Sequence, residues 1–169
     1  MENKPTKRKI VASRHLATTD GWPLSEFEFG LIVAYNGFSR WVSRCMAASG
    51  YPSLSTLEIL VLHNITHRDR GKRLSDICFI LNIEDAHTVN YAIKKLMKHG
   101  LVTGEKSGKE MLYSTTTEGV ELCSEYRDTR EQCLIQSLSV DSSELSEIAA
   151  TLRTLSGIYD QAARAASSL

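Results

Sequence analysis

The sequence lacks any apolar run of about 18 residues, so it offers no candidate for a transmembrane helix. Its basic N-terminal stretch also lacks the apolar core of a secretory signal. These two absences predict a cytoplasmic protein with no membrane partner. The 169 residues are enough for one domain with a buried core, with or without oligomerisation arms.

Catalytic motifs are absent as well. The chain has no glycine-rich phosphate-binding loop, no nucleophile elbow and no His–Cys pair with supporting spacing. Ser and Thr residues are numerous, but no catalytic partner accompanies them. We therefore predict that the protein is not an enzyme and needs no cofactor.

The cysteines and histidines follow no metal-ligand pattern. Each cysteine falls at or near an apolar helical position, which favours small buried side chains in a reducing compartment: Cys45, Cys78, Cys123 and Cys133. An oxidation-sensing thiol is the alternative, with Cys45 and Cys123 as candidates. His63 and His67 are one helical turn apart, but no carboxylate or thiol at ligand spacing accompanies them, so we predict no metal site.

The formal net charge is zero, but the charges are unevenly distributed. Residues 1–14 carry a net charge of +4 and residues 68–115 a net charge of +3, whereas residues 116–169 carry −5. DNA would repel the acidic C-terminal segment, which is therefore expected to point away from it. Overall neutrality does not exclude a nucleic-acid partner.

Residues 74–100 have the pattern of a helix-turn-helix. The apolar spacing of 74–81 predicts a short helix, and a polar break over 82–85 follows it, with Asp85 placed to cap the next helix. That helix, 86–99, carries an apolar face, and Gly100 can end it in the left-handed conformation.

Two β-rich segments follow this helix pair. They cover 101–103 and 111–115 and flank a polar turn at 106–109. A helix pair followed by a basic-tipped hairpin is typical of winged helix-turn-helix proteins, which place one helix in the major groove and the hairpin against the DNA backbone or minor groove. The basic loop at 68–72 either forms a short third strand or links helices. Double-stranded DNA is therefore the predicted partner.

The flanking segments predict helices with exposed apolar stripes. Ser25 is placed to cap a helix reaching about Ala48, and a capping box at 55–58 begins a second helix to about Thr66. A polar helix is expected from Thr117 to about Leu138. The last helix has apolar residues at alternating spacings of three and four, which favours packing against another helix: Leu145, Ile148, Leu152, Leu155, Tyr159, Ala162 and Ala166.

The expected fold class is mainly α with a small β-wing, a winged helix-turn-helix with dimerisation helices at both ends. We divide the chain into a basic N-terminal arm, a dimerisation helix, the DNA-binding domain, and a long helix followed by a C-terminal dimerisation helix: 1–23, 24–50, 51–117 and 118–169. A two-fold dimer would present two recognition helices about 34 Å apart.

The order of these elements and several of their motifs resemble the MarR family of transcriptional regulators. The resemblance rests on Leu74-Ser75-Asp76-Ile77, on the helix end at 95–102 with its Gly-Leu-Val, and on 113–119, where the second wing strand enters a Thr-Thr-Glu-Gly junction. It implies a triangular homodimer that binds palindromic operators, often as a repressor. The resemblance also implies release by small anionic or phenolic ligands, or by thiol oxidation.

The wing departs from the family pattern. The family usually carries an Asp-x-Arg element there, whereas this chain has Lys106-Ser107-Gly108-Lys109-Glu110. A lysine is a point charge without the guanidinium fork, so phosphate contact is the expected role of the wing.

Candidate DNA-contacting residues lie on and around the recognition helix. Asn90 is suited to a bidentate pair with adenine, and Thr88 to donating to a base or packing on a thymine methyl. His87 is suited to donating to guanine or to phosphate. Lysines near the helix end are expected at phosphates. The full set is His87, Thr88, Asn90, Tyr91, Lys94, Lys95 and Lys98, with Lys106 and Lys109 on the wing and Arg73 before the first helix of the pair.

A candidate effector site lies on the first long helix. An arginine beside an aromatic ring suits a small anionic or aromatic effector, and equally suits a dimer interface: Arg40, Trp41, Arg44 and Cys45. Two alternatives to a ligand-responsive repressor stay open: a DNA-binding regulator triggered by thiol oxidation, and a winged-helix protein-interaction module that does not bind DNA.

Overall fold

The computed structural model describes residues 21–68 and 70–169, and its chain divides into two compact units, up to Arg130 and from Glu131 onward. The expected basic arm over 1–23 lies almost wholly outside the described residues. The elements run in the order α1 (Trp22–Ala48), α2 (Thr56–Thr66), α3 (Leu74–Leu81), α4 (Ala86–Lys98), β1 (Val102–Ser107), β2 (Glu110–Thr115), α5 (Thr117–Cys133), the short 3₁₀ helix η1 (Ile135–Ser137) and α6 (Ser142–Ala166).

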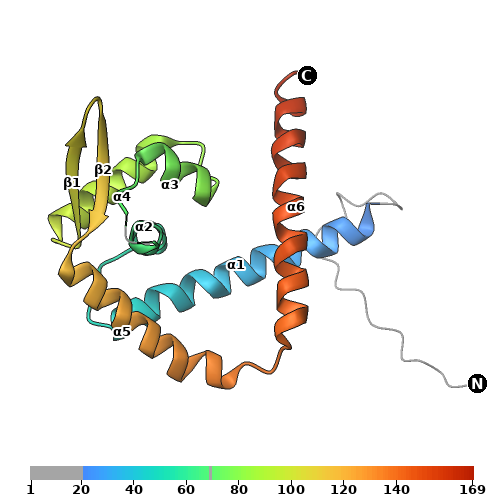
Figure 1. Ribbon diagram of the computed structural model, residues 1–169. Helices are drawn as coiled ribbons and strands as arrows, with labels where there is room; N and C mark the ends of the chain where they lie inside the picture. The colour runs from blue at the N-terminus through green and yellow to red at the C-terminus, as the bar shows by residue number, and fades with distance from the viewer. Residues whose placement is uncertain (1–20, 69) are drawn as a thin grey trace, which may run out of the picture. The chain divides into compact units, whose positions relative to one another are not determined.

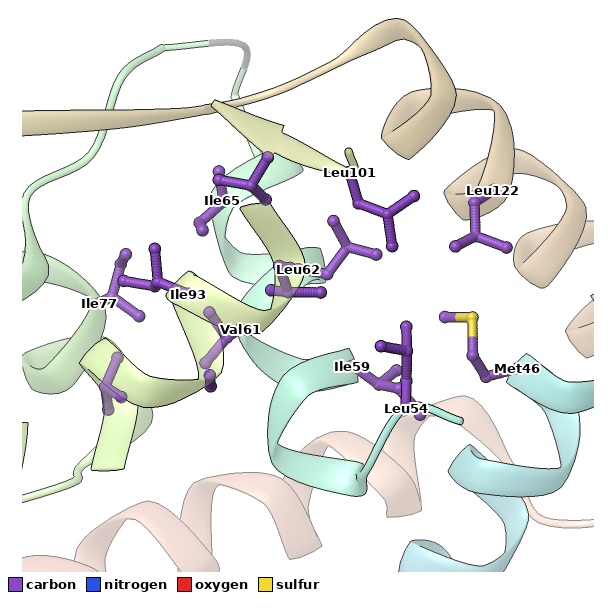
Figure 2. Packing of buried hydrophobic residues seen from close by; sticks show 14 of the residues in the cluster. Met46, Leu54, Ile59, Val61, Leu62, Ile65, Ile77, Ile93, Leu101 and Leu122 are labelled. Atoms are coloured by element: carbon purple, nitrogen blue, oxygen red, sulfur yellow. The ribbon is translucent and has the colours of Figure 1, made fainter. Parts of the chain in front are cut away.

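A small three-helix cluster with a hairpin forms the centre of the first unit. Helices α2, α3 and α4 pack on one another, and the β1–β2 hairpin extends beside α4 (Figure 1). The core is made of branched aliphatic side chains from each of these helices, joined by Met46 of α1, Leu101 and Leu122 of α5 (Figure 2). This core fixes α4 against α2 and leaves its other side in solvent.

The local signals that start and end these helices are where the sequence predicts them. The Ser55 hydroxyl accepts from the Glu58 amide at 3.4 Å, and the Glu58 carboxylate accepts from the Ser55 amide at 2.8 Å. Asp85 accepts the His87 amide at 2.9 Å and so caps α4. Gly100 has φ +73°, a conformation that costs glycine little. The predicted helix-turn-helix is thereby confirmed.

The wing is longer and tighter than predicted. Its strands pair in antiparallel register from Val102↔Thr115 to Ser107↔Glu110, which leaves a two-residue turn. Gly108 has φ +63° at the first turn position, as type II′ hairpins require. The basic loop adds one bridge, Lys72↔Tyr113, rather than a full third strand.

Helix α1 begins three residues before the predicted cap. Ser25 lies inside the helix and its amide donates to the Gly21 carbonyl at 3.2 Å, so the prediction of Ser25 as the cap is wrong. Pro23 is tolerated there because first-turn amides have no helical partner. The N-terminal two thirds of the helix exposes large apolar side chains: Leu24, Leu31, Ile32, Val33, Tyr35 and Phe38.

The second unit consists mainly of one long helix. Helix α5 ends at Cys133, earlier than the predicted Leu138, and the chain continues through Leu134 into the 3₁₀ helix η1. Asp141 caps α6, accepting the Ser143 amide at 2.7 Å. Helix α6 also exposes apolar side chains of the predicted seam: Leu145, Ile148 and Leu152.

Candidate nucleic-acid interface

One side of α4 is open to solvent along its whole length. His87, Tyr91, Lys94 and Lys98 follow one another at spacings of four, three and four, so they share one helical face, and all four are exposed. Tyr91, near the middle of this face, is 71% exposed. The opposite face is buried in the core: Val89, Ala92, Ile93 and Leu96.

Two predicted base-contacting residues sit differently from this face. The Thr88 hydroxyl donates to the Asp85 carboxylate at 2.8 Å, so its proton is committed to the helix cap. That bond, with the amide of His87, holds the pKa of Asp85 below its usual range. Asn90 is half-buried at the edge of the exposed face. The structure thus brings His87 and Tyr91 to the centre of the face and leaves Thr88 and Asn90 at its margins.

The Lys95 side chain bonds to groups within the protein, whereas Lys94 and Lys98 are exposed to solvent. Its ammonium lies 3.0 Å from the Glu58 carboxylate and 3.2 Å from the Ser53 carbonyl, at the start of α2. Sequence reasoning placed all three lysines together because helical spacing gives no sign of a partner on another helix.

The remaining basic candidates lie on the wing side. Arg73, just before α3, forms an exposed ion pair with Glu110 of β2 at 2.8 Å, and so joins the helix-turn-helix to the wing. Exposed pairs of this kind contribute little to stability, so the guanidinium is free to exchange Glu110 for another anion. Lys106 and Lys109 are exposed at the wing tip.

Two open hollows flank α4 on the side of α2. One, of about 450 Å³, lies between the α2 N-terminus and residues His87, Thr88 and Tyr91. The other, of about 480 Å³, is lined by Ser53 and by the basic end of the helix. The exposed face of α4 therefore projects as a ridge beside two depressions. This shape is complementary to a DNA groove bordered by its two phosphate backbones.

The predicted effector residues divide into two pairs on α1. Arg40 and Arg44, one turn apart, are exposed, whereas Trp41 is partly buried against the core and Cys45 is 1% exposed. The Cys45 thiol donates to the Tyr126 carbonyl at 3.6 Å. The two arginine side chains are thus exposed to solvent, whereas Trp41 and Cys45 pack against the core.

None of the four cysteines, all of which lie in the described ranges, forms a disulfide. Burial raises the pKa of Cys123, and the Thr66 hydroxyl lies 3.5 Å from its sulfur. A raised pKa reduces the thiolate fraction on which oxidation depends. Cys133, at the end of α5, is exposed. Nothing in the sequence indicated this exposure, because Cys133 follows the same apolar pattern as the other three cysteines.

His63 is a partly buried imidazole between α2 and α5. Its ring packs edge-on against Tyr126 with centroids 4.5 Å apart, and its Nε2 has no hydrogen-bond partner. Burial lowers the pKa of His63 below 6.5. Among the described residues, no group of three or more His, Cys, Asp or Glu side chains is arranged to hold a metal ion.

The buried imidazole makes stability depend on pH. The unfolded chain takes up a proton at His63 more readily than the folded chain, so acidification through and below 6.5 should lower the free energy of unfolding. Replacement His63→Phe should weaken this dependence in urea titrations between about pH 8 and about pH 5. An identical pH dependence in His63→Phe would contradict this role for the buried ring.

Comparisons with known proteins agree with this architecture. Residues 54–119 match a family model described as a winged helix DNA-binding domain. None of the curated protein sequences matches the chain. No helix among the described ranges is long and apolar enough to cross a membrane.

Solved structures match over most of the chain. AbfR of Staphylococcus epidermidis has a TM-score of 0.68 at 16% identity, covering 82% of this chain and 92% of that one. A MarR mutant from E. coli complexed with operator DNA has 0.66 at 14%, covering 82% and 99%. CouR from Rhodococcus jostii bound to p-coumaroyl-CoA has 0.63 at 14%, covering 77% and 91%.

Helices α2–α4 and the β1–β2 hairpin form a winged helix fold, and residues 54–119 are similar to winged helix DNA-binding domains. Over most of its length the chain has the same fold as solved structures of the MarR family, which confirms the predicted fold class and the predicted resemblance to that family.

Proposed function

We propose that this protein is a MarR-type transcriptional regulator that binds a palindromic operator as a homodimer and acts as a repressor, without catalytic activity. The observation that carries the proposal is the solvent-exposed basic face of α4, held rigidly by the core behind it and by the Asp85 cap at its start. Such a helix fits the major groove and presents its side chains to base edges.

In this proposal the exposed residues have separate roles. His87 and Tyr91 face base edges, with Asn90 at the margin, because they lie near the helix start or centre. Lys94 and Lys98 lie toward the helix end and neutralise phosphates. Arg73, Lys106 and Lys109 add backbone contacts from the wing side, since the wing lacks an arginine for the minor groove.

Dimerisation is proposed through α1 and α6. Each helix carries large apolar side chains that its own unit does not bury, and covering them stabilises by about 25 cal/mol per Å² of apolar surface. A second copy of the chain covers such rows with the two-fold symmetry that a palindromic site requires.

The α6 seam gives a direct test of this interface. The double variant Ile148→Glu, Leu152→Glu should convert the dimer to a monomer, because both side chains are already exposed within one chain. Operator affinity should then fall by roughly 10²-fold or more, since the two half-sites no longer bind together. Analytical ultracentrifugation and DNA titration measure the two effects. Gln161→Glu, on the opposite side of α6, is the control, and a dimeric double variant would refute the placement.

An effector response is the third part of the proposal. CouR is bound to p-coumaroyl-CoA in its solved structure. In this chain Arg40 and Arg44 offer two exposed guanidinium groups one turn apart for a small anionic or aromatic effector. Thiol oxidation is the weaker alternative, because Cys45 is buried and the pKa of Cys123 is raised.

The decisive experiment mixes the purified protein with fragmented genomic DNA of its source at about 0.15 M salt and sequences the retained fragments. A shared near-palindrome with half-sites about one helical turn apart supports the proposal. Retention of nothing, or of DNA without a common sequence, favours the protein-interaction alternative, as does early elution from heparin.

A further inference from the structure

The recognition helix is attached at two points, one turn apart, to the first turn of α2 and to the segment that joins α1 to α2. The first point is Lys95, whose ammonium bonds the Glu58 carboxylate and the Ser53 carbonyl. The second is His99, whose carbonyl accepts the Tyr51 hydroxyl at 3.4 Å. The rings of Tyr51 and His99 also meet edge to face, with centroids 5.7 Å apart.

The Glu58 carboxylate is the centre of the first attachment. Glu58 is 4% exposed, and one of its oxygens accepts both the Ser55 amide and the Lys95 ammonium. A buried carboxylate is costly to leave without a cation, so removing Lys95 from this position carries a penalty that an exposed lysine does not have. Lys95 is therefore held in place by a partner within the protein.

We propose that Glu58 and Lys95 are positioning residues for DNA recognition: their pair sets the angle at which α4 projects, and the Lys95 ammonium does not contact phosphate. This inference rests on the proposed function. Lys94 and Lys98, the lysines on either side along the chain, carry the phosphate contacts of this helix.

The proposal makes a prediction opposite in sign to simple electrostatics. Glu58→Gln removes a negative charge near DNA, which by itself strengthens binding, and it releases Lys95 to reach a phosphate. Glutamine at this position still serves a capping box, so the start of α2 is preserved. If the pair positions α4, Glu58→Gln instead lowers operator affinity by about tenfold and leaves affinity for random DNA nearly unchanged.

The salt dependence of binding separates positioning from phosphate contact. In a dimer, Lys98→Gln removes two phosphate contacts and should reduce the slope of log K against log salt by about 1.8. Lys95→Gln should lower operator affinity with the slope unchanged. The double variant Glu58→Gln, Lys95→Gln should be no worse than either single change, because both remove the same interaction. Lys95→Arg, which keeps the charge, should restore most of the operator affinity.

All variants are compared as full-length chains, with folding checked by urea unfolding before DNA titration. Tighter DNA binding by Glu58→Gln, or a slope in Lys95→Gln that falls as in Lys98→Gln, overturns the inference while leaving DNA binding intact. Failure of the wild-type chain to bind any common sequence overturns the proposed function itself, and the inference with it. If Lys95→Gln does not fold, the comparison of Glu58→Gln with Lys98→Gln decides.

Discussion

Replacement of Gly119 by alanine is expected to lower the free energy of unfolding by about 3 kcal/mol, because the added methyl group has no room. The alanine Cβ would overlap the Leu101 carbonyl oxygen and would lie 2.6 Å from the Thr115 methyl carbon. The Leu101 oxygen cannot easily move, since it accepts the Thr116 amide at 3.1 Å. The first turn of α5 would have to lift from the start of the wing.

The matched control is Gly157→Ala in α6, where an added Cβ meets nothing within 4 Å. That change should stabilise the chain by up to about 1 kcal/mol through helix propensity alone. Urea unfolding of both variants measures the difference. Equal stabilities for the two alanine variants would show that α5 does not pack as closely on Leu101 as the structure describes.

The second large effect is expected on DNA binding. The double variant Lys94→Gln, Lys98→Gln removes two exposed charges from each subunit, so a dimer loses about 3.6 from the slope of log K against log salt. At about 0.15 M salt this corresponds to a fall of roughly 10²- to 10³-fold in affinity, for operator and random DNA alike. Fluorescence anisotropy over a range of salt concentrations measures both quantities.

A control variant with the same change in net charge distinguishes direct contact of Lys94 and Lys98 with DNA phosphates from the general attraction between the protein's net charge and DNA. Arg153→Gln with Arg164→Gln removes two positive charges from α6, which is proposed to lie away from DNA. This variant should keep the wild-type slope. A similar loss of slope in both variants would show that net charge, and not the α4 face, governs binding.

Local signals in the sequence predicted the elements that carry the site. The Ser55–Glu58 capping box, the Asp85 cap and Gly100 are each determined by residues within one helical turn, so they were visible without a structure. The spacing of the α4 side chains likewise gave both its buried and its exposed face. These features are local, and helical periodicity is enough to find them.

Contacts between elements distant in sequence could not be predicted in this way. The pairing of Lys95 with Glu58 spans 37 residues, and the Arg73–Glu110 pair also spans 37. The start of α1 was misplaced because Ser25 is a good cap residue, yet Gly21-Trp22-Pro23 continues the helix backward. Each of these features depends on which elements pack together in the folded chain, and the local sequence does not contain that information.

The two-residue turn of the wing has a thermodynamic consequence. Hydrogen-bonded register continues to Ser107↔Glu110, so Lys106 and Lys109 stand on a tip that is already ordered before any partner arrives. A long wing loop loses backbone entropy when it settles on DNA, at about 1–2 kcal/mol per residue fixed. This two-residue turn has far less backbone entropy to lose on binding than a long loop has. Lys106 and Lys109 therefore offer the DNA backbone a preorganised contact, and the length of the hairpin sets how far that contact reaches.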